Sequence, residues 1–255
     1  MQKLLEKKAL RNISPIHQLT LNESEEPKIA IQLRSTKDAV KNNGLKVMTY
    51  GHAGTGKTSL CATTGAPTVI ISAEAGLLSL RGHDIAVIEV GSIADVHEAY
   101  NYLSGPDGEQ FEWICLDSIS EIAEQVLNFE KKNSKDPRQA YGALAEQMQD
   151  LIRAFRDMPG KNVYMSCKME RIKDEQGGLV YSPSMPGAKL SQAISYFFDE
   201  VFVLRAEKAD DGQIYRTLQT QGDYNYVAKD RSGALELYEE PNLGKIAAKI
   251  IGSTN

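Results

Sequence analysis

Eight consecutive residues, Gly51-His52-Ala53-Gly54-Thr55-Gly56-Lys57-Thr58, match the phosphate-binding loop pattern G-x-x-x-x-G-K-[ST] at every fixed position. Glycines let the backbone turn tightly and aim its N–H groups at an anion. Lys57 can reach the β- and γ-phosphates of a nucleotide, and the Thr58 hydroxyl can hold Mg²⁺. An ordinary glycine-rich turn does not need the Lys-Thr pair. We therefore expect a nucleoside triphosphate site formed by Gly51, His52, Ala53, Gly54, Thr55, Gly56, Lys57, Thr58 and Ser59.

A carboxylate at the end of a second apolar strand could complete a metal site. Residues 111–117 form an apolar run that ends in Asp117, and a phosphate-binding loop needs such an acidic partner for Mg²⁺. Asp117 and Ser118 are also good helix caps, so a buried strand followed by a capped helix explains this segment equally well when it is taken alone. With the phosphate-binding loop upstream, the sequence favours Mg²⁺ held by Thr58 and Asp117.

A third short strand begins at Thr68 and ends in Glu74, which is a candidate base for positioning an attacking water. Ligands bind at the carboxyl edge of a parallel sheet, so Glu74, Asp117 and the phosphate-binding loop should meet there. The alternative is a solvated glutamate at the end of a strand, because glutamate is common on surfaces. Glu121 is a rival base, but its expected place inside a helix favours a surface or capping role.

The elements that must position these residues alternate between strand and helix. Strands are expected at 45–50, 68–74, 87–90, 111–117 and 162–167, with helices between them whose apolar faces include Ile93, Ile122, Phe129, Tyr141 and Met148. This alternation predicts a mainly parallel α/β sheet covered by helices on both faces. Past residue 198, successive strands at 201–204, 214–220 and 224–229 predict an antiparallel edge extension, followed by a helix over 243–251.

Composition sets further bounds. The 255 residues are 42% hydrophobic and 25% charged, with a net charge of −5, which argues against a globally basic nucleic-acid coat. No apolar run approaches the length of a membrane span, and the first residues lack a secretory signal. Cys61, Cys115 and Cys167 lie in or beside apolar segments, as expected for reduced, buried thiols in a cytoplasm. The four histidines show no metal-ligand spacing.

Taken together, the segments 51–58, Ser72-Ala73-Glu74 and Leu116-Asp117-Ser118 resemble the motifs of the RecA-like ATPases. The likeness covers roughly residues 45 to 235. More narrowly, the layout is similar to that of the small phage-encoded ATP-binding proteins of the single-strand annealing recombinase group. The resemblance implies ATP with Mg²⁺ and a RecA-like core over 28–255. It also implies an N-terminal arm over 1–27 that docks on a neighbouring subunit, although a frayed tail explains the arm equally well.

The resemblance also implies two loops that contact single-stranded DNA. They correspond to residues 131–138 and 168–189, and the glycines and prolines of the second predict a mobile loop. Basic side chains there can neutralise phosphates, and Tyr181 can stack on a base. Acidic neighbours dilute the charge, so a solvated surface loop is the alternative. The implied DNA-binding residues are Lys131, Lys132, Lys135, Arg138, Lys168, Arg171, Lys173, Tyr181 and Lys189.

Two further features follow from the same resemblance. Lys229 and Arg231 correspond to a stretch by which related rings and filaments reach the ATP of a neighbouring subunit, although the end of a hairpin with solvated charges explains them equally well. The polar residue that usually senses the γ-phosphate is replaced by Ser166-Cys167-Lys168, of which Ser166 or Lys168 could substitute.

The expected function is therefore an ATP-hydrolysing DNA recombination protein, stimulated by DNA. It would bind single-stranded DNA and promote annealing or strand pairing as a homo-oligomer, ring or filament. We expect it in the cytoplasm, that of a bacterial host if it is phage-encoded, with a single-strand binding protein as a further candidate partner and no membrane partner. The alternatives are an ATPase acting as motor or loader on protein partners, and a scaffold that uses ATP only to assemble.

Overall fold

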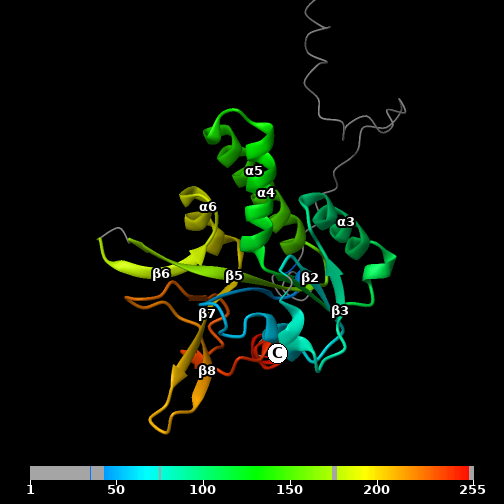
Figure 1. Ribbon diagram of the computed structural model, residues 1–255. Helices are drawn as coiled ribbons and strands as arrows, with labels where there is room; N and C mark the ends of the chain where they lie inside the picture. The colour runs from blue at the N-terminus through cyan, green and yellow to red at the C-terminus, as the bar shows by residue number, and fades with distance from the viewer. Residues whose placement is uncertain (1–34, 36–42, 75, 174–176, 253–255) are drawn as a thin grey trace, which may run out of the picture. The chain divides into compact units, whose positions relative to one another are not determined.

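One mixed sheet organises the residues that the structure, a computed structural model, describes: 35, 43–74, 76–173 and 177–252 (Figure 1). Among them it has ten strands: β1 (Lys46–Tyr50), β2 (Thr68–Ser72), β3 (Ala86–Glu89), β4 (Trp113–Asp117), β5 (Asn162–Lys173), β6 (Leu179–Ser184), β7 (Glu200–Lys208), β8 (Ile214–Gln219), β9 (Lys229–Asp230) and β10 (Tyr238–Glu239). The order is β10-β8-β7-β1-β5-β4-β2-β3, with β6 on β5 and β9 on β7. The arm predicted over 1–27 lies outside the described residues.

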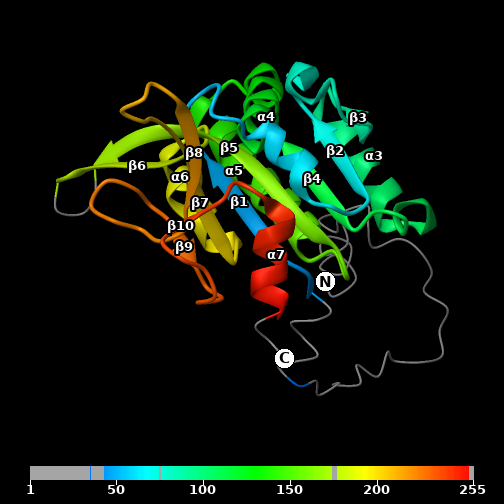
Figure 2. The ribbon, with the colours of Figure 1, turned by 90° about the horizontal axis from the view of Figure 1, so that it is seen from below.

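Strands β7, β1, β5, β4, β2 and β3 run parallel to their neighbours, whereas β6, β8, β9 and β10 pair antiparallel. Figure 2 shows β8 and β10 beside β7, at one side of the parallel strands. The predicted fold class, a mainly parallel α/β sheet with an antiparallel edge extension, is therefore confirmed.

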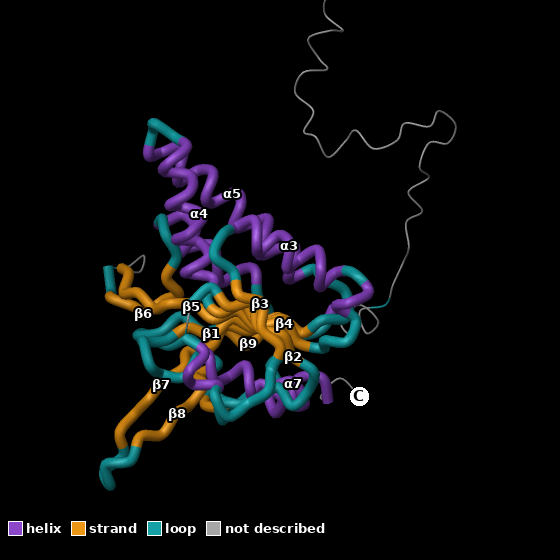
Figure 3. Tube along the Cα trace, turned by 45° about the vertical axis from the view of Figure 1, so that its right-hand side comes forward, coloured by secondary structure: helices purple, strands orange, loops and turns teal. Residues whose placement is uncertain are grey.

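Helices cover both faces of this sheet. The helices are α3 (Ile93–Ser104), α4 (Ile119–Asn133), α5 (Pro137–Arg156), α6 (Ala188–Ala193) and α7 (Leu243–Gly252), with 3₁₀ segments η2 (Thr58–Thr63), η3 (Leu77–Leu80), η4 (Pro106–Gly108) and η5 (Ile194–Phe197). Figure 3 shows α3, α4 and α5 on one side of the strands and α7 on the other. None of the helices in the described part of the chain is long and apolar enough to span a membrane.

Successive strand residues serve two separate cores because side chains alternate between the faces of a sheet. Met48 and Ile71 pack in the core beneath α3, α4 and α5. Their neighbours Val47 and Ile70 pack in the opposite core, beneath η2 and α7, together with the single tryptophan, Trp113. Strands that are apolar on both faces belong in the interior of a parallel sheet, as the continuous runs in the sequence predicted. Cys61, Cys115 and Cys167 are free and buried in these cores, as expected.

The strand register brings polar residues to the carboxyl edge. Ser72 at the end of β2 lies opposite Asp117 at the end of β4. On the other side of the sheet centre, Thr49 in β1 lies opposite Ser166 in β5. The loop after β1, residues 51–57, therefore leaves the sheet close to Asp117.

Three local expectations are corrected. Residues 168–189 are not an irregular loop: β5 continues to Lys173 and pairs with β6 as a hairpin, of which 174–176 lie outside the described residues. The segment after the phosphate-binding loop, where the sequence predicts the opening of a helix, is a six-residue 3₁₀ helix, η2; it ends before Gly65, which adopts a φ of 70°, and Pro67, which lacks an N–H. The strand expected at 224–229 is reduced to β9 and one bridge between Tyr181 and Tyr226.

Two aromatic residues that were expected in the core are exposed. Phe129 is 54% exposed and Tyr141 is 41% exposed. Both lie where α4 and α5 meet, which Figure 1 shows projecting beyond the sheet. Helical periodicity predicted the correct face, but the helices extend past the strands that would have buried these positions.

The amino edge of the sheet holds a buried acid, Glu200. Its side chain accepts a hydrogen bond from the Ser232 amide at 3.2 Å, and its Oε2 atom has no partner among the described residues. Burial and the nearby negative charges of Asp230 and Asp199 raise the pKa of Glu200 to about 8. Folding therefore favours the protonated carboxyl.

We expect stability to fall with rising pH because of this group. The folded pKa of about 8 exceeds the ordinary value of 4.5, so the native state binds the extra proton between these values and loses that advantage as pH rises. As pH rises from about 5 to about 8, the unfolding free energy of Glu200→Gln relative to that of the wild type should increase by about 3 kcal/mol. Denaturant unfolding at several pH values measures this. Glu146→Gln, on the exposed face of α5, is the control. Parallel pH profiles for Glu200→Gln and wild type would contradict the assignment.

Candidate functional site

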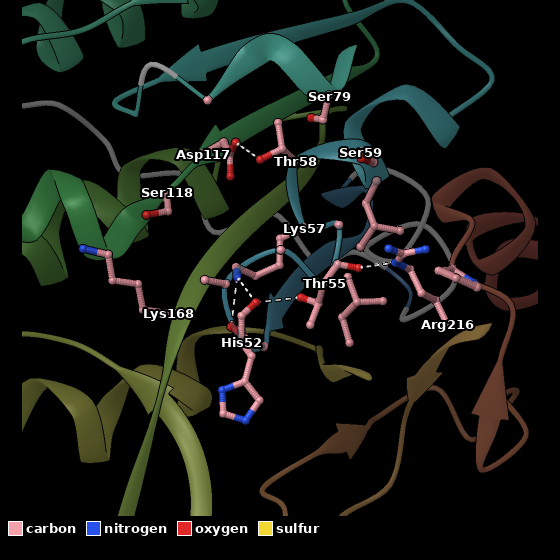
Figure 4. Close-up of a pocket in the computed structure, with 18 of the residues that line it drawn as sticks. His52, Thr55, Lys57, Thr58, Ser59, Ser79, Asp117, Ser118, Lys168 and Arg216 are labelled. Atoms are coloured by element: carbon pink, nitrogen blue, oxygen red, sulfur yellow. Dashed lines mark hydrogen bonds between the residues drawn. The ribbon is translucent and has the colours of Figure 1, made fainter. Parts of the chain in front are cut away.

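A cleft of about 830 Å³ lies at the carboxyl edge of the sheet, with the phosphate-binding loop as its floor (Figure 4). It is lined by Gly51, His52, Ala53, Gly54, Thr55, Gly56, Lys57, Thr58, Ser59, Leu60, Thr63, Glu74, Gly76, Ser79, Asp117, Ser118, Lys168, Met169, Leu204, Arg216 and Pro241. All nine predicted nucleotide-binding residues line the cleft, together with Asp117 and Glu74. The volume falls within the range of pockets that hold small ligands and cofactors.

Two glycines of the loop are required by its geometry. A Cβ on Gly51 would lie 2.7 Å from the Leu204 carbonyl oxygen, so only glycine lets the middle of β7 approach the loop. Gly56 has a φ of 104°, a conformation that side chains disfavour. Within the loop, the amide and the hydroxyl of Thr55 both donate to the His52 carbonyl, the hydroxyl at 2.9 Å.

Lys57 bends back over the loop. Its ammonium donates to the carbonyl oxygens of Gly51 at 2.9 Å and of His52 at 3.0 Å. Its own carbonyl accepts from the hydroxyl of Tyr164, a buried residue of β5, at 2.9 Å. Burial lowers the pKa of Lys57, and the negative charges of Asp117 and Glu74 oppose that shift. The ammonium therefore lies at the centre of the loop, where an anion would replace the carbonyl oxygens as its partner.

Thr58 and Asp117, the predicted metal ligands, are in contact. The Thr58 hydroxyl donates to Asp117 Oδ2 at 2.7 Å, and the Ser166 hydroxyl donates to the other carboxylate oxygen. Asp117 is only 4% exposed. One carboxylate and one hydroxyl are hard oxygen donors that suit Mg²⁺, which takes its remaining ligands from phosphates and water. The described residues contain no cluster of three His, Cys, Asp or Glu side chains that would hold a metal without a phosphate.

Glu74 is held at the same side of the cleft. Its Oε1 accepts from the Ser118 hydroxyl at 2.6 Å, and its backbone carbonyl accepts from the Ser72 hydroxyl at 2.7 Å. Ser118 also caps α4 by accepting from the Glu121 amide at 3.3 Å. The sequence indicated the cap, but it carried no signal that Ser118 orients the Glu74 carboxylate.

The rival carboxylate, Glu121, has a different partner. It accepts from the Lys168 ammonium at 2.9 Å, and Glu124, one turn further along α4, accepts from the same group at 2.8 Å. Burial lowers the pKa of Lys168, but hydrogen bonds with Glu124 and Glu121 outweigh this and raise the pKa overall. Lys168, unlike Glu121, lines the cleft. The geometry places Glu74, rather than Glu121, beside Asp117 and Lys57.

Arg216, from β8, was not anticipated from the sequence. Its Nε donates to the Thr55 carbonyl at 2.8 Å, and Figure 4 shows its guanidinium at the opposite end of the loop from Asp117. The two bonded residues are 161 positions apart. No local pattern could have found this contact, because it depends on how β8 joins the edge of the sheet.

The residues implied in DNA binding do not form one site. Lys131, Lys132, Lys135 and Arg138 are exposed near the junction of α4 and α5, and Lys131 lies 5.4 Å from the centre of the Tyr141 ring. Lys168 belongs to the cleft, whereas Lys173 at the end of the β5–β6 hairpin and Lys189 in α6 are exposed.

Tyr181 stacks within the protein. Its ring lies 5.1 Å from that of Tyr226, and the Arg171 guanidinium lies 5.4 Å from its centre. His52 approaches the same ring edge-on at 5.8 Å, and the Tyr50 hydroxyl donates to the Tyr181 carbonyl at 3.0 Å. The middle of the hairpin, where Tyr181 pairs with Arg171, is thereby joined to the phosphate-binding loop.

Lys229 and Arg231 lie at the amino end of β7, away from the cleft of their own chain. The Lys229 ammonium donates to the carbonyl oxygens of Ser195 at 2.9 Å and of Phe198 at 2.5 Å. Arg231 pairs with Asp199 at 2.8 Å, with its side chain 60% exposed. Of the two, Arg231 has the more accessible head group.

Comparison with protein families agrees with this geometry. Residues 43–232 match the family model described as an AAA domain. Among solved structures, a KaiC-like protein from the hyperthermophilic archaeon Pyrococcus horikoshii OT3 matches with 18% identity and a TM-score of 0.44, over 69% of this chain and 78% of that chain. No curated protein matches the sequence. Because the family match spans well over half of the chain and includes the phosphate-binding loop and Asp117, the chain belongs to the AAA domain family of P-loop ATPases.

Proposed function

We propose that this chain hydrolyses ATP in the cleft at the carboxyl edge of its sheet. The observation that carries the proposal is the convergence of Lys57, the Thr58–Asp117 contact and Glu74 on one cleft. These groups supply a phosphate cradle, hard oxygen ligands for a cation, and a second carboxylate beside them.

Each residue has a distinct part in this chemistry. The loop amides and Lys57 hold the β- and γ-phosphates, and Thr58 and Asp117 hold Mg²⁺, which would neutralise the charge that develops on the phosphate oxygens. Glu74 accepts a hydrogen bond from the attacking water and orients it, while Ser118 fixes the direction of the Glu74 carboxylate. Lys168 and Ser166 are the candidates for sensing the γ-phosphate, since Lys168 lines the cleft and Ser166 contacts Asp117.

We further propose that the ATPase is a DNA recombination protein, phage-encoded and acting in the host cytoplasm, which binds single-stranded DNA and promotes its annealing. Support comes from the resemblance of its motifs to the single-strand annealing group and from the exposed basic side chains around the α4–α5 junction. Cationic side chains on a projecting element can neutralise phosphates without a globally basic surface. An annealing assay with and without ATP tests this function against the motor or loader and the assembly scaffold.

The proposal includes a homo-oligomer in which Arg231 reaches the ATP of a neighbouring subunit. Its support is placement: Arg231 is exposed at the amino edge, opposite the edge that holds its own cleft. An arginine supplied in trans stabilises the charge of the transition state for phosphoryl transfer. Lys229 would support it by holding the adjoining backbone, because its ammonium is bonded to two carbonyl oxygens of the same chain.

Glu74→Gln should keep ATP binding while its rate of hydrolysis falls by about a hundredfold or more, because the amide preserves size but cannot orient the water as a base.

Lys57→Ala should lose nucleotide binding or turnover while the fold persists. Phosphate release and nucleotide titration measure both. Glu121→Gln tests the rival base, since that carboxylate does not line the cleft and pairs with the cleft residue Lys168. Loss of hydrolysis in Glu121→Gln with activity retained in Glu74→Gln would show that the base has been misassigned.

Replacing Lys131, Lys132 and Lys135 together by glutamine should weaken binding of single-stranded DNA. The slope of log affinity against log salt should flatten by about 0.7 per lost phosphate contact. Fluorescence anisotropy of a labelled oligonucleotide at several salt concentrations measures both quantities. A control with equal charge loss replaces the exposed residues Arg81, Lys208 and Lys245 by glutamine, since these lie away from the α4–α5 junction. Equal effects of the two triple variants would remove the junction from the DNA site.

Arg231→Ala should bind ATP nearly normally and hydrolyse it slowly, because such an arginine acts mainly on the transition state. Mixing decides whether it acts in trans. An Arg231→Ala subunit retains a sound loop and a Lys57→Ala subunit retains a sound arginine, so the mixture should recover part of the activity that each lacks. No recovery, combined with wild-type activity per subunit that does not change on dilution to monomer, would place the whole active site within one chain.

A further inference from the structure

The cleft has two chemically different ends. One end carries the carboxylates Asp117 and Glu74 with the Thr58 hydroxyl, which suits a metal and the terminal phosphate. The other end is lined by Leu204 and Arg216, where β7 and β8 approach the loop, and by Pro241, just before α7. Of the residues that line the cleft at this second end, none is acidic.

Arg216 is fixed in place but not neutralised. Its Nε donates to the Thr55 carbonyl at 2.8 Å. The same Nε atom lies 3.6 Å from the position that a Cβ on Gly56 would occupy. Among the described residues, no acidic side chain forms an ion pair with Arg216. The residue is exposed, and Figure 4 shows its guanidinium beside the loop. One bond therefore holds the plane of the guanidinium beside the loop and leaves its face available.

The direction of a bound nucleotide follows from the two ends. If Thr58 and Asp117 hold Mg²⁺ at the terminal phosphates, the α-phosphate lies further along the loop and the nucleoside must leave the loop at the end away from Asp117. That end is where Arg216 lies. The arginine guanidinium is a planar, weakly hydrated cation and is suited to stack on an aromatic base beside proline and leucine. A lysine ammonium, which is a point charge on a flexible stem, is not.

We propose that Arg216 is the residue that recognises the nucleoside half of the nucleotide: its guanidinium plane packs on a purine base, with Leu204 and Pro241 as the apolar surroundings. This rests on the proposed ATP site. The contact is made within one chain, in contrast to the contact between subunits proposed for Arg231. Arg216 would therefore act on ATP and ADP alike and leave the terminal phosphate untouched.

Three ligands separate the base from the phosphates: ATP, ADP and inorganic tripolyphosphate, each titrated with Mg²⁺ into the full chain. Arg216→Ala should weaken ATP and ADP by the same factor, about tenfold, and leave tripolyphosphate affinity unchanged. Arg216→Lys should resemble Arg216→Ala, because lysine restores the charge without the plane. Lys208→Ala, a lost cation in the same hairpin that does not line the cleft, should match the wild type for all three ligands.

Other outcomes would overturn the assignment. An equal loss of tripolyphosphate affinity in Arg216→Ala would mean that Arg216 serves the phosphates or the shape of the loop through Thr55. Full recovery in Arg216→Lys would indicate a charge contact, and unchanged ATP affinity in Arg216→Ala would indicate no contact. Failure of the ATP site itself would look different: the wild type would bind none of the three ligands, or Lys57→Ala would bind all of them normally.

Discussion

The Asp117 carboxylate receives hydroxyl hydrogen bonds from two different segments, and the cleft takes its shape from this small network. Thr58 is the last residue of the P-loop and Ser166 lies on β5, so Asp117 joins the loop to the neighbouring strand. Asp117 is only 4% exposed, and burying its carboxylate would cost considerable folding free energy without such hydrogen-bond donors. Because Asp117 ends β4, a slip of one residue in the register of that strand would turn its side chain to the other face of the sheet. The metal ligands, the loop and the strand register therefore depend on one another.

The parts of the fold and site that could be predicted are those that local sequence specifies. We could predict that Lys57, Thr58, Asp117 and Glu74 meet in one cleft. The prediction needed the P-loop pattern, the apolar strands and the rule that parallel strands share a carboxyl edge. The change of pattern after residue 198 likewise predicted the antiparallel extension. Each inference used a window of a few residues and one general property of sheets.

The parts that could not be predicted depend on contacts between distant segments. The bond from Arg216 to Thr55 joins residues far apart in sequence, and nothing in β8 distinguishes this arginine from a solvated one. Phe129 and Tyr141 fit a helical apolar face, but the helices outrun the sheet. The segment 168–189 has the glycines and prolines of a loop, yet strand pairing between β5 and β6 overrides that composition. Periodicity identifies a face, and it does not reveal whether anything covers that face.

The anchoring of Tyr181 fixes the middle of the β5–β6 hairpin to the nucleotide loop. Tyr50 and His52, on either side of the first residue of the P-loop, both contact Tyr181, which lies in the hairpin and stacks on Tyr226. Two of the six residue pairs that join the strands of the hairpin lie beyond Tyr181, Ile172 with Val180 and Lys173 with Leu179, and at about 3.4 Å per residue they extend about 7 Å past it. A rotation of about 5° at Tyr181 would therefore move the last of these pairs by less than about 1 Å, as simple geometry applied to that length requires. The hairpin would follow a displacement of the P-loop as one body with it, without magnifying that displacement.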